Sequence, residues 1–277
     1  MEFSQADIVR LRRIVWRYYK VHGRHDLPWR RTENPYDILV SEVMLQQTQV
    51  GRVVPKYVAF LKHFPTINAL ALAPLREVLV QWQGLGYNRR AKMLHEASCA
   101  VVEQYAGKMP DAFDELCKLP GVGAYTAGAV CAFAHNRCVS MVETNIRTVL
   151  FHHLLHEHDG VADSNLLQIT NLLCPRGRAR EWYWALMDYG AHLKGQGVRV
   201  NYKSKHYAKQ SKFEGSDRQL RGAIVRVCST EQSITVHTLV RRLQADLTNA
   251  APERIRAQLD RLVREGFLTR DGSRVHA

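Results

Sequence analysis

Apolar residues recur at intervals of three and four through the first two thirds of the chain, and this spacing predicts amphipathic helices. Clear helical patterns begin at Ile8, Tyr36, Leu75 and Leu166. Proline and glycine separate these patterns, as expected of residues that end helices. Strand-like alternation is nearly absent from the same part of the chain. Residues 1–193 are therefore predicted to form an all-α domain.

The pattern changes in residues 194–216, where large aliphatic residues are scarce. Lysines dominate this segment, and Tyr202, Tyr207 and Phe213 lie among them. Basic residues with interleaved aromatics are typical of a track that binds phosphates and stacks bases, although a solvated linker has the same composition. We interpret the segment as a basic linker that contacts DNA. The candidate phosphate contacts are Lys203, Lys205, Lys209 and Lys212.

Residues 217–277 are predicted to form a separate module. Three short amphipathic helices are expected from apolar patterns that begin at Leu220, Val236 and Ile255. The dipeptide Asp271-Gly272, between two short β-competent runs, predicts a hairpin. Three helices followed by a two-stranded wing make a winged helix, a module that binds DNA in some proteins and mediates protein contacts in others.

Charge narrows the choice of partners. Lysine and arginine (39) exceed aspartate and glutamate (26) by 13. This excess favours nucleic acid as the first candidate partner and an anionic membrane as the second. The alternative is a basic soluble protein whose charge serves no polyanionic partner. No apolar run reaches the roughly 18 residues of a spanning helix, and the N-terminal sequence MEFSQADIVRLRR lacks the apolar core of a secretory signal. We therefore expect a cytoplasmic, nucleoid-associated protein with no membrane partner.

The six cysteines are scattered along the chain, without a Cys-x-x-Cys pair or a histidine at zinc-finger spacing. Such spacing is typical of reduced, buried cysteines rather than of a metal cluster. We therefore expect reduced thiols throughout and no metal site built from side chains.

The sequence LPGVGAYTAGAV places two glycines directly before a small-residue helix. A dinucleotide fingerprint would need a preceding strand, but a helical segment precedes this one, and the Gly-Lys-Ser/Thr of a Walker loop is absent. What remains is a helix, a hairpin and a helix, in which backbone N–H groups approach a phosphate. This arrangement holds a DNA backbone without reading its sequence. The candidate contacts are Leu119, Gly121, Val122 and Gly123.

Two glutamates have neighbours that are unusually apolar for this residue type. Glu42 lies in SEVMLQQTQV, and Glu143 lies in MVETNIRTVL, two residues before Asn145, where a helix is expected to begin. Taken alone, a glutamate is more often a surface or capping residue. An apolar environment raises the pKa of a carboxyl group, and perturbed acids gather at functional sites. Both glutamates are therefore candidate catalytic acids.

Five motifs occur in the order and at the spacing of one protein family: LPWR, SEVMLQQTQV, GLGY, LPGVGAYTAGAV and ALMDYGA. Through them the chain resembles the MutY-type adenine DNA glycosylases of the helix-hairpin-helix (HhH-GPD) base-excision superfamily, over roughly residues 20 to 193. The resemblance implies a two-lobed all-α fold, followed here by the small winged-helix module. We expect double-stranded DNA with a mismatch or lesion as the partner, and a monomeric protein.

The resemblance also implies roles for matching residues. Glu42 looks like the acid that protonates the adenine ring and later handles the attacking water. Glu143 stands where the family has a catalytic aspartate, Tyr125 looks like the tyrosine beside the two carboxylates, and Asn145 looks like the amide that orients them. Gln46 and Tyr87 look like residues that enter the base stack when a nucleotide is flipped, and Gln47 is a further candidate DNA contact. The candidate base pocket consists of Trp29, Arg30 and Trp184.

The chemistry agrees with these roles. Cleavage of an N-glycosidic bond develops positive charge on the sugar and negative charge on the base, so a carboxylate near the sugar and an acid near the base both lower the barrier. Adenine leaves poorly unless it is protonated, so Glu42 favours a purine and adenine first. A thymine, uracil or another damaged base in a mispair is one alternative, and a non-catalytic protein that binds DNA structures is another.

Endonuclease III, in the same superfamily, has at the position of Tyr125 a lysine that attacks the sugar and then cleaves the strand. A tyrosine cannot form that Schiff base. The resemblance therefore implies a monofunctional glycosylase with little or no lyase activity.

The chain departs from the family at four points. Glu143 is one methylene longer than the usual aspartate, and Trp184 stands where the family commonly has Gln or Glu. The four iron–sulfur cysteines are missing, with Lys194 at the first position, so we expect no cofactor and no iron–sulfur cluster. The winged helix replaces the usual Nudix-like domain. The only ion expected is a monovalent cation on backbone carbonyls of residues 119–123.

Overall fold

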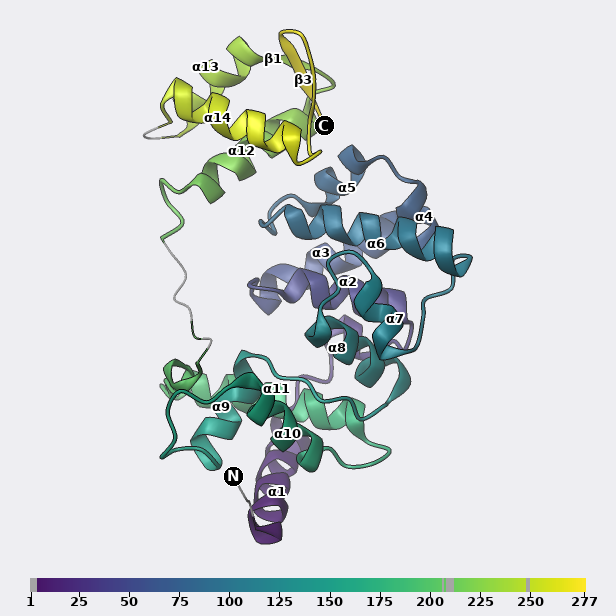
Figure 1. Cartoon of the computed structure of the whole chain (residues 1–277), viewed down its shortest axis with the longest axis vertical. Coiled ribbons are helices and arrows are strands. Elements are labelled where there is room, and N and C mark those ends of the chain that lie inside the picture. The colour runs from purple at the N-terminus through teal and green to yellow at the C-terminus, as the bar shows by residue number, and fades with distance from the viewer. Residues whose placement is uncertain (1–3, 206, 208–211, 248–249) are drawn as a thin grey trace. The chain divides into compact units, whose positions relative to one another are not determined.

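The computed structural model describes residues 4–205, 207, 212–247 and 250–277, which fold mainly as α-helices (Figure 1). They form two compact units. The first comprises residues 1–42, 110–118 and 122–209 as far as they are described, and the second comprises residues 43–109, 119–121 and 210–277. The predicted domain boundaries after residues 193 and 216 are not those of these units, and they stay predictions.

The elements follow one another in this order: α1 (Gln5–His22), η1 (Pro28–Arg30), α2 (Pro35–Leu45), α3 (Val50–His63), α4 (Ile67–Leu72), α5 (Leu75–Trp82), α6 (Arg89–Tyr105), α7 (Phe113–Lys118), α8 (Ala124–His135), α9 (Thr144–His153), α10 (Asp163–Leu173), α11 (Ala179–Gly195), η2 (Asn201–Lys203), α12 (Asp217–Thr230), β1 (Ile234–Thr235), α13 (Val236–Asp246), α14 (Pro252–Arg264), β2 (Thr269–Asp271) and β3 (Arg274–His276). The described residues before β1 contain no strand beyond one isolated bridge. The predicted all-α class is confirmed.

The first unit is built around α8 and α11. From its third residue to its eleventh, α8 is buried on every side, as expected of a helix without a polar face. Helix α11 packs against α9, α1 and α8. Its Gly190 allows close contact with α9, because a Cβ there would lie 2.1 Å from the Asn145 carbonyl oxygen. A side chain at this position would displace the start of α9, which carries candidate site residues.

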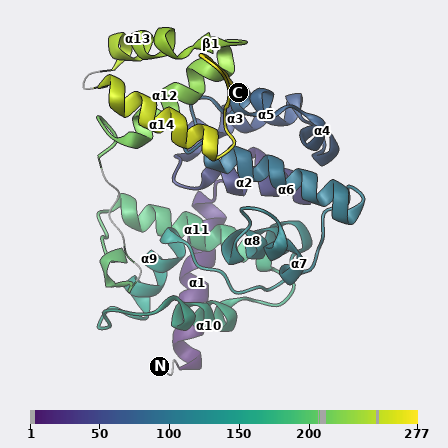
Figure 2. The same ribbon diagram turned by 45° about the horizontal axis from the view of Figure 1, so that its top comes forward.

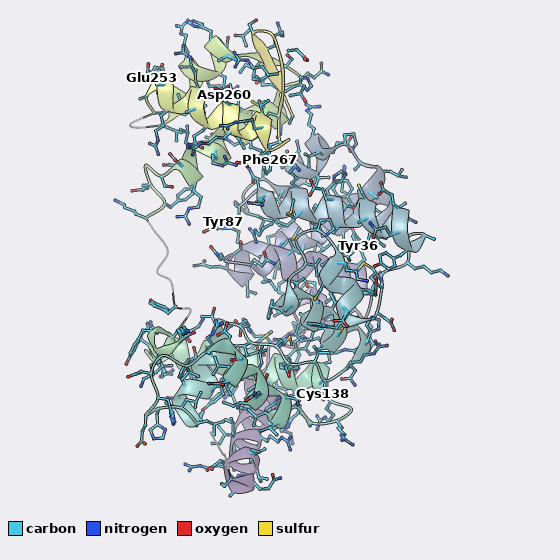
Figure 3. All side chains as sticks on the ribbon, in the orientation of Figure 1. Tyr36, Tyr87, Cys138, Glu253, Asp260 and Phe267 are labelled. Atoms are coloured by element: carbon cyan, nitrogen blue, oxygen red, sulfur yellow. A yellow bond between two sulfur atoms is a disulfide. The ribbon has the colours of Figure 1, made fainter. Side chains whose placement is uncertain are left out.

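One prediction about the cysteines is wrong. Cys138, after α8, and Cys174, after α10, form a disulfide (Figure 3 labels Cys138). The two residues are 36 positions apart, and only the packing of the first unit brings their Cα atoms to 6.1 Å. Scattered spacing therefore did not indicate free thiols here. The four other cysteines are free.

The second unit contains helices α3 to α6 and the C-terminal module, in which α12 packs against α5. The three predicted helices of the module are α12, α13 and α14, grouped together in Figure 2. The predicted hairpin joins β2 to β3, with Asp271 opposite Arg274. The predicted two-stranded wing gains a third strand, because β1 pairs with β3 and the sheet order is β1-β3-β2. The module has the element order and sheet of a winged helix.

Candidate active site

Glu42 lies on the last two turns of α2 and is only 5% exposed. The Tyr125 hydroxyl, on the first turn of α8, donates a hydrogen bond to its Oε2 atom at 2.8 Å. Burial raises the pKa of Glu42 from 4.5 to about 7. The hydrogen bond from Tyr125 and the charge of Arg30 oppose this rise, and the charge of Glu143 adds to it. A carboxyl group with this pKa is suited to give up and regain a proton at neutral pH.

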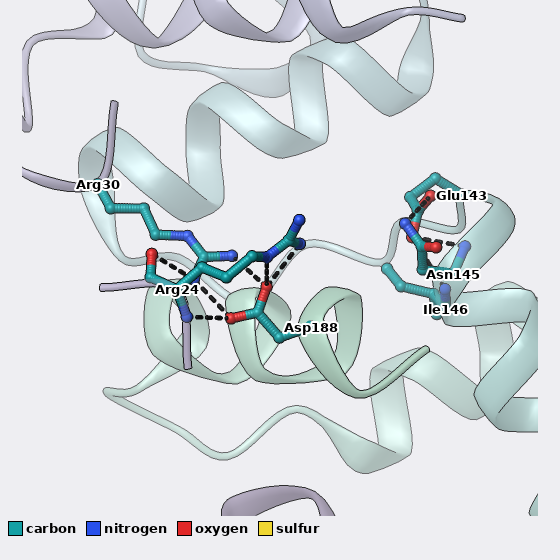
Figure 4. A network of polar contacts seen from close by, with 6 residues as sticks. All are labelled: Arg24, Arg30, Glu143, Asn145, Ile146 and Asp188. Atoms are coloured by element: carbon teal, nitrogen blue, oxygen red, sulfur yellow. Dashed lines mark hydrogen bonds and ion pairs between the residues drawn. The ribbon is translucent and has the colours of Figure 1, made fainter. Parts of the chain in front are cut away.

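Glu143 is the N-cap residue of α9, and hydrogen bonds from the first turn of that helix fix the position of its side chain (Figure 4). Its Oε1 atom accepts hydrogen bonds from the backbone N–H groups of Asn145 (2.8 Å) and Ile146 (2.9 Å), and its Oε2 atom accepts one from Asn145 Nδ2 (3.1 Å). Burial raises the pKa of Glu143 above its usual value, and these N–H groups and the charge of Lys194 only partly oppose the rise. The donors fix the position of both carboxyl oxygens.

The two carboxyl groups interact electrostatically, and the neighbouring tyrosine responds to both. The charge of Glu143 raises the pKa of Glu42, and burial together with the charges of Glu42 and Glu143 raises the pKa of Tyr125 well above 10. Tyr125 therefore stays a hydrogen-bond donor at neutral pH. Asn145 completes the group: its Oδ1 atom is buried without a partner among the described residues. The structure brings together all four predicted catalytic residues, within the first unit.

The three predicted pocket residues are buried, and Arg30 is held by an acid that the motif analysis left without a role. Asp188, on α11, accepts hydrogen bonds from both terminal nitrogens of Arg30, at 2.7 and 2.8 Å, and from Arg24 (Figure 4). Burial raises the pKa of Asp188, but the hydrogen bonds and charges of Arg30 and Arg24 together outweigh it and leave the pKa lowered. The guanidinium lies 5.3 Å from the ring centroid of Trp184, and both Trp184 and Trp29 are less than a tenth exposed.

Asp188 is the acid of the motif ALMDYGA, so the motif itself was a signal for it. Its charge balances Arg30, whose positive field in turn limits the rise in the pKa of Glu42. Trp184 also stacks on Phe133 of α8, with ring centroids 5.7 Å apart. A tryptophan packed in this way supplies a ring face and one N–H donor, but no hydrogen-bond acceptor.

The predicted helix-hairpin-helix is present as α7, the loop of residues 119–123, and α8. Gly121 has φ +72° and a Cβ on it would lie 2.5 Å from Met93 Cβ, so both its conformation and its packing require glycine. Leu119 and Val122 are buried and anchor the loop, whereas Gly121 and Gly123 are exposed. Gly123 caps α8 without a side chain, which leaves the N-terminal N–H groups of a 12-residue helix open to an anion.

The candidate DNA contacts Gln46, Gln47 and Tyr87 lie in two loops of the second unit, and a buried arginine links these loops. Gln47 and Tyr87 both adopt left-handed backbone conformations, with φ +54° and +49°, and Gln46 is half-buried. Arg90 donates hydrogen bonds to the carbonyls of Val43, Met44, Gln46, Leu85 and Gly86 and to the hydroxyl of Thr48. Burial lowers the pKa of Arg90 to about 10. Sequence reasoning missed this residue, because nothing in its local pattern distinguishes it from Arg89.

The candidate lysines divide into three groups. Lys203 is 13% exposed, donates to the His156 carbonyl at 2.8 Å and pairs with Asp159 at 3.2 Å. Its ammonium group is therefore paired within the fold, and its contact with phosphate stays a prediction. Lys205 and Lys212 are exposed, with Glu214 3.8 Å from Lys212. Lys209 lies outside the described residues.

The described residues contain no group of three or more His, Cys, Asp or Glu side chains arranged to hold a metal ion. None of the described helices combines the length and apolar character needed to cross a lipid bilayer.

Comparison with known proteins places this geometry in a family. Residues 40–174 match the model of the HhH-GPD superfamily base excision DNA repair protein. An adenine DNA glycosylase of Mycolicibacterium smegmatis is 36% identical over 274 residues, which cover 91% of either chain. One from Mycobacterium tuberculosis is 40% identical over 182 residues, covering 64% of this chain and 59% of the relative. The chain belongs to the adenine DNA glycosylase family, within the HhH-GPD superfamily of base excision DNA repair proteins.

Solved structures agree on the fold. A thermostable thymine-DNA glycosylase is 28% identical and has a TM-score of 0.60, covering 67% of this chain and 87% of its own. Endonuclease III in a non-covalent DNA complex has a TM-score of 0.56 at 21% identity, covering 69% and 86%. The second similarity concerns the fold alone.

Proposed function

We propose that this protein is a monofunctional DNA glycosylase that hydrolyses the N-glycosidic bond of adenine in a mispaired or damaged duplex. The observation that carries the proposal is Glu42, a buried acid with a pKa of about 7, in one site with Glu143, whose carboxyl oxygens accept hydrogen bonds from the start of α9. Two acids in one site with different tasks are the arrangement that acid-assisted glycosidic cleavage requires. The names of the relatives support adenine as the base.

In this mechanism the target nucleotide is flipped out of the duplex, at a cost of a few kcal/mol that is smallest where pairing is already poor. Protonated Glu42 donates its proton to a ring nitrogen of adenine, so that the base leaves as a neutral molecule. The carboxylate of Glu143 stabilises the positive charge that develops on the sugar. Glu42, now ionised, accepts a proton from the water that attacks the sugar carbon. Asn145 holds Glu143 through Nδ2 and offers its unpartnered Oδ1 atom to that water.

The DNA grip that we propose uses backbone rather than base contacts. The hairpin of residues 119–123 presents N–H groups to a phosphate, with a monovalent cation on its carbonyls as the only ion. Exposed Lys205 and Lys212 add charge where relatives are expected to carry an iron–sulfur loop. The protein acts as a monomer in the cytoplasm, on DNA with a mismatch or lesion, without a cofactor.

Thymine is the second candidate base, because the thymine-DNA glycosylase named above shares the fold at 28% identity. The acid favours adenine over thymine. A pyrimidine leaves as a stabilised anion and needs no proton, whereas adenine does. A protein that only binds DNA structures would have no use for a buried acid whose pKa is raised to about 7.

The experiment that tests the proposal is mass spectrometry of the bases released from duplexes that carry a panel of lesions and mispairs. We expect free adenine from a mispair, and no covalent adduct when the same reactions contain borohydride, because Tyr125 carries no amine. If only thymine or uracil were released, that base and not adenine would be the substrate. Efficient borohydride trapping would contradict the monofunctional assignment, and binding without any base release would favour the non-catalytic alternative.

Tyr125→Phe is expected to move the pH profile of adenine release. The hydrogen bond from Tyr125 lowers the pKa of Glu42, so its loss raises that pKa further. Because the protonated form of Glu42 is active, the alkaline limb of the profile should move to higher pH. Single-turnover rates between pH 5 and 9 measure the limb. Tyr202→Phe, on an exposed tyrosine, is the control and should leave the profile unchanged; an alkaline limb that stays in place in Tyr125→Phe would contradict the role of the hydrogen bond.

A further inference from the structure

A surface pocket lies between α1 and α11, two helices of the first unit that pack against each other. Its volume is about 720 Å³, and it is lined by six side chains of α1 from Arg13 to His22 and by Tyr189 of α11. None of the four predicted catalytic residues belongs to this lining. The pocket, called here the α1 pocket, is therefore separate from the candidate active site.

Aromatic rings cluster at the α1 pocket. The Tyr18 ring centroid lies 5.4 Å from that of Tyr189, 5.1 Å from that of His22 and 4.7 Å from that of His192. His153 fixes Tyr189, because its ring stacks on the tyrosine at 5.6 Å and its Nε2 atom lies 2.9 Å from the tyrosine hydroxyl. A cluster of ring faces is the kind of surface on which an unpaired nucleobase stacks, whatever its sequence.

A row of cations on α1 runs past the pocket. The row, called here the α1 stripe, has spacings of three, four and three residues, which place its members on one face of the helix. All of its members are exposed, and they are Arg10, Arg13, Arg17 and Lys20. The acid of this helix, Asp7, is held at the N-cap by Ser4. Ten residues of helix extend over about 15 Å, so the positive charge reaches well beyond the pocket.

The rings and the charges together define the class of ligand. A bare phosphate makes no use of the rings, and a neutral aromatic molecule makes no use of Arg13 and Arg17, which line the pocket. A nucleobase joined to phosphates uses both kinds of group. A paired base has both of its faces stacked inside the duplex, so the base that enters the pocket is an unpaired one. A free nucleotide would fill the pocket but leave the rest of the α1 stripe unused.

We propose that the α1 pocket and the α1 stripe bind a single-stranded segment of nucleic acid. One unpaired base stacks on the rings of Tyr18 and His22, and the phosphates on either side of it lie against Arg13 and Arg17. The site goes beyond the proposed function, because it needs neither a lesion nor the catalytic acids. It gives the protein a contact with unpaired strands that differs from its contact with a mispaired duplex.

The test measures binding of a fluorescein-labelled strand of about twelve deoxythymidines to the full-length protein. This strand offers neither a mispair nor an adenine. The double variant Arg13→Ala/Arg17→Ala should bind it about tenfold more weakly. The slope of log affinity against log salt should fall by about 1.4, or about 0.7 for each lost charge.

Two further variants separate charge from stacking. Val21→Asp places an anion in the pocket on a valine that is 70% exposed, so it removes no packing and should weaken binding about tenfold. Val58→Asp, on a 53% exposed valine of α3, is the matched control and should stay within about twofold. His22→Ala removes a ring and should cost about fivefold without changing the salt slope, whereas His22→Phe should restore the affinity.

Unchanged strand affinity in the double variant and in Val21→Asp would overturn the proposal. An equal loss of affinity for a mispaired duplex would also overturn it, and would make the α1 stripe part of the duplex contact. Adenosine monophosphate that bound as tightly as the strand would replace the strand by a free nucleotide. Loss of binding to phosphatidylglycerol vesicles in Val21→Asp, with strand affinity unchanged, would indicate a lipid surface instead. None of these measurements requires base release, so failure of the proposed function would leave them interpretable.

Discussion

Replacement of Glu42 by glutamine is expected to lower the rate of adenine release about a thousandfold, while DNA affinity changes by less than about threefold. Glutamine has the shape of the protonated acid and accepts the hydrogen bond from Tyr125, but it has no proton to give. Single-turnover assays of base release and binding titrations with the same duplex measure the two quantities. Glu103→Gln, on an exposed glutamate of α6, is the matched control and should leave both unchanged.

The same variant separates function from stability. The pKa of Glu42 is 4.5 for an ordinary glutamate, as in the unfolded chain, and about 7 in the folded protein. This difference corresponds to about 3 kcal/mol in the free energy of unfolding. Folding therefore favours the protonated acid, so this contribution is fully present below pH 4.5 and is lost as the pH rises through 7. Glu42→Gln should melt at a higher temperature than the unmodified protein at pH 9, and the gain should shrink at pH 5. Full activity of Glu42→Gln on adenine would remove Glu42 from the mechanism, whatever its stability.

Arg90→Ala is expected to destabilise the second unit by about 3–5 kcal/mol. The substitution leaves buried carbonyls of two loops without donors and removes a guanidinium that lies 5.5 Å from the ring centroids of Trp82 and Tyr87. Thermal melting measures the loss, and hydrogen exchange should show it first at residues 43–48 and 84–87. Because these loops carry Gln46 and Tyr87, binding to mispaired DNA should weaken together with stability.

Arg89→Ala is the matched control, because Arg89 is the exposed neighbour in the chain and should cost less than about 0.5 kcal/mol. Arg90→Lys keeps the charge but replaces a planar fork with a single ammonium, so it should recover only part of the stability. If Arg90→Ala melted like the unmodified protein, the carbonyls around it would have other partners and the linkage between the two loops would be refuted.

The pattern of apolar residues predicted most of the helices correctly because helix formation depends on nearby positions. The pattern from Leu75 to Trp82 coincides with α5, and the Asp271-Gly272 hairpin joins β2 to β3. Strand β1 was missed because two residues carry no periodic signal, and they become a strand only by pairing with β3. The disulfide between Cys138 and Cys174 was missed for a similar reason. The spacing of cysteines in the sequence does not show that the ends of α8 and α10 lie close together in the fold.

For the candidate site, the sequence identified the residues but not their pKa values or their ion pairs. Apolar neighbours indicated that burial raises the pKa of Glu42, yet the size of the shift also depends on Tyr125, Glu143 and Arg30, which come from other elements. Lys203 shows the opposite case, because its local sequence predicted a free cation and the fold pairs it with Asp159.

The sequence by itself determined the helical class, the hairpin glycines, the two acids and the positive charge of this protein, since each depends on residue identity and short-range spacing. Only the tertiary structure decided which charges are paired, how far the pKa of Glu42 is raised and how Arg90 and Arg218 contact Tyr87. Electrostatic energies and desolvation depend on distances of a few ångströms between elements that are far apart in the chain. Chain packing alone sets those distances.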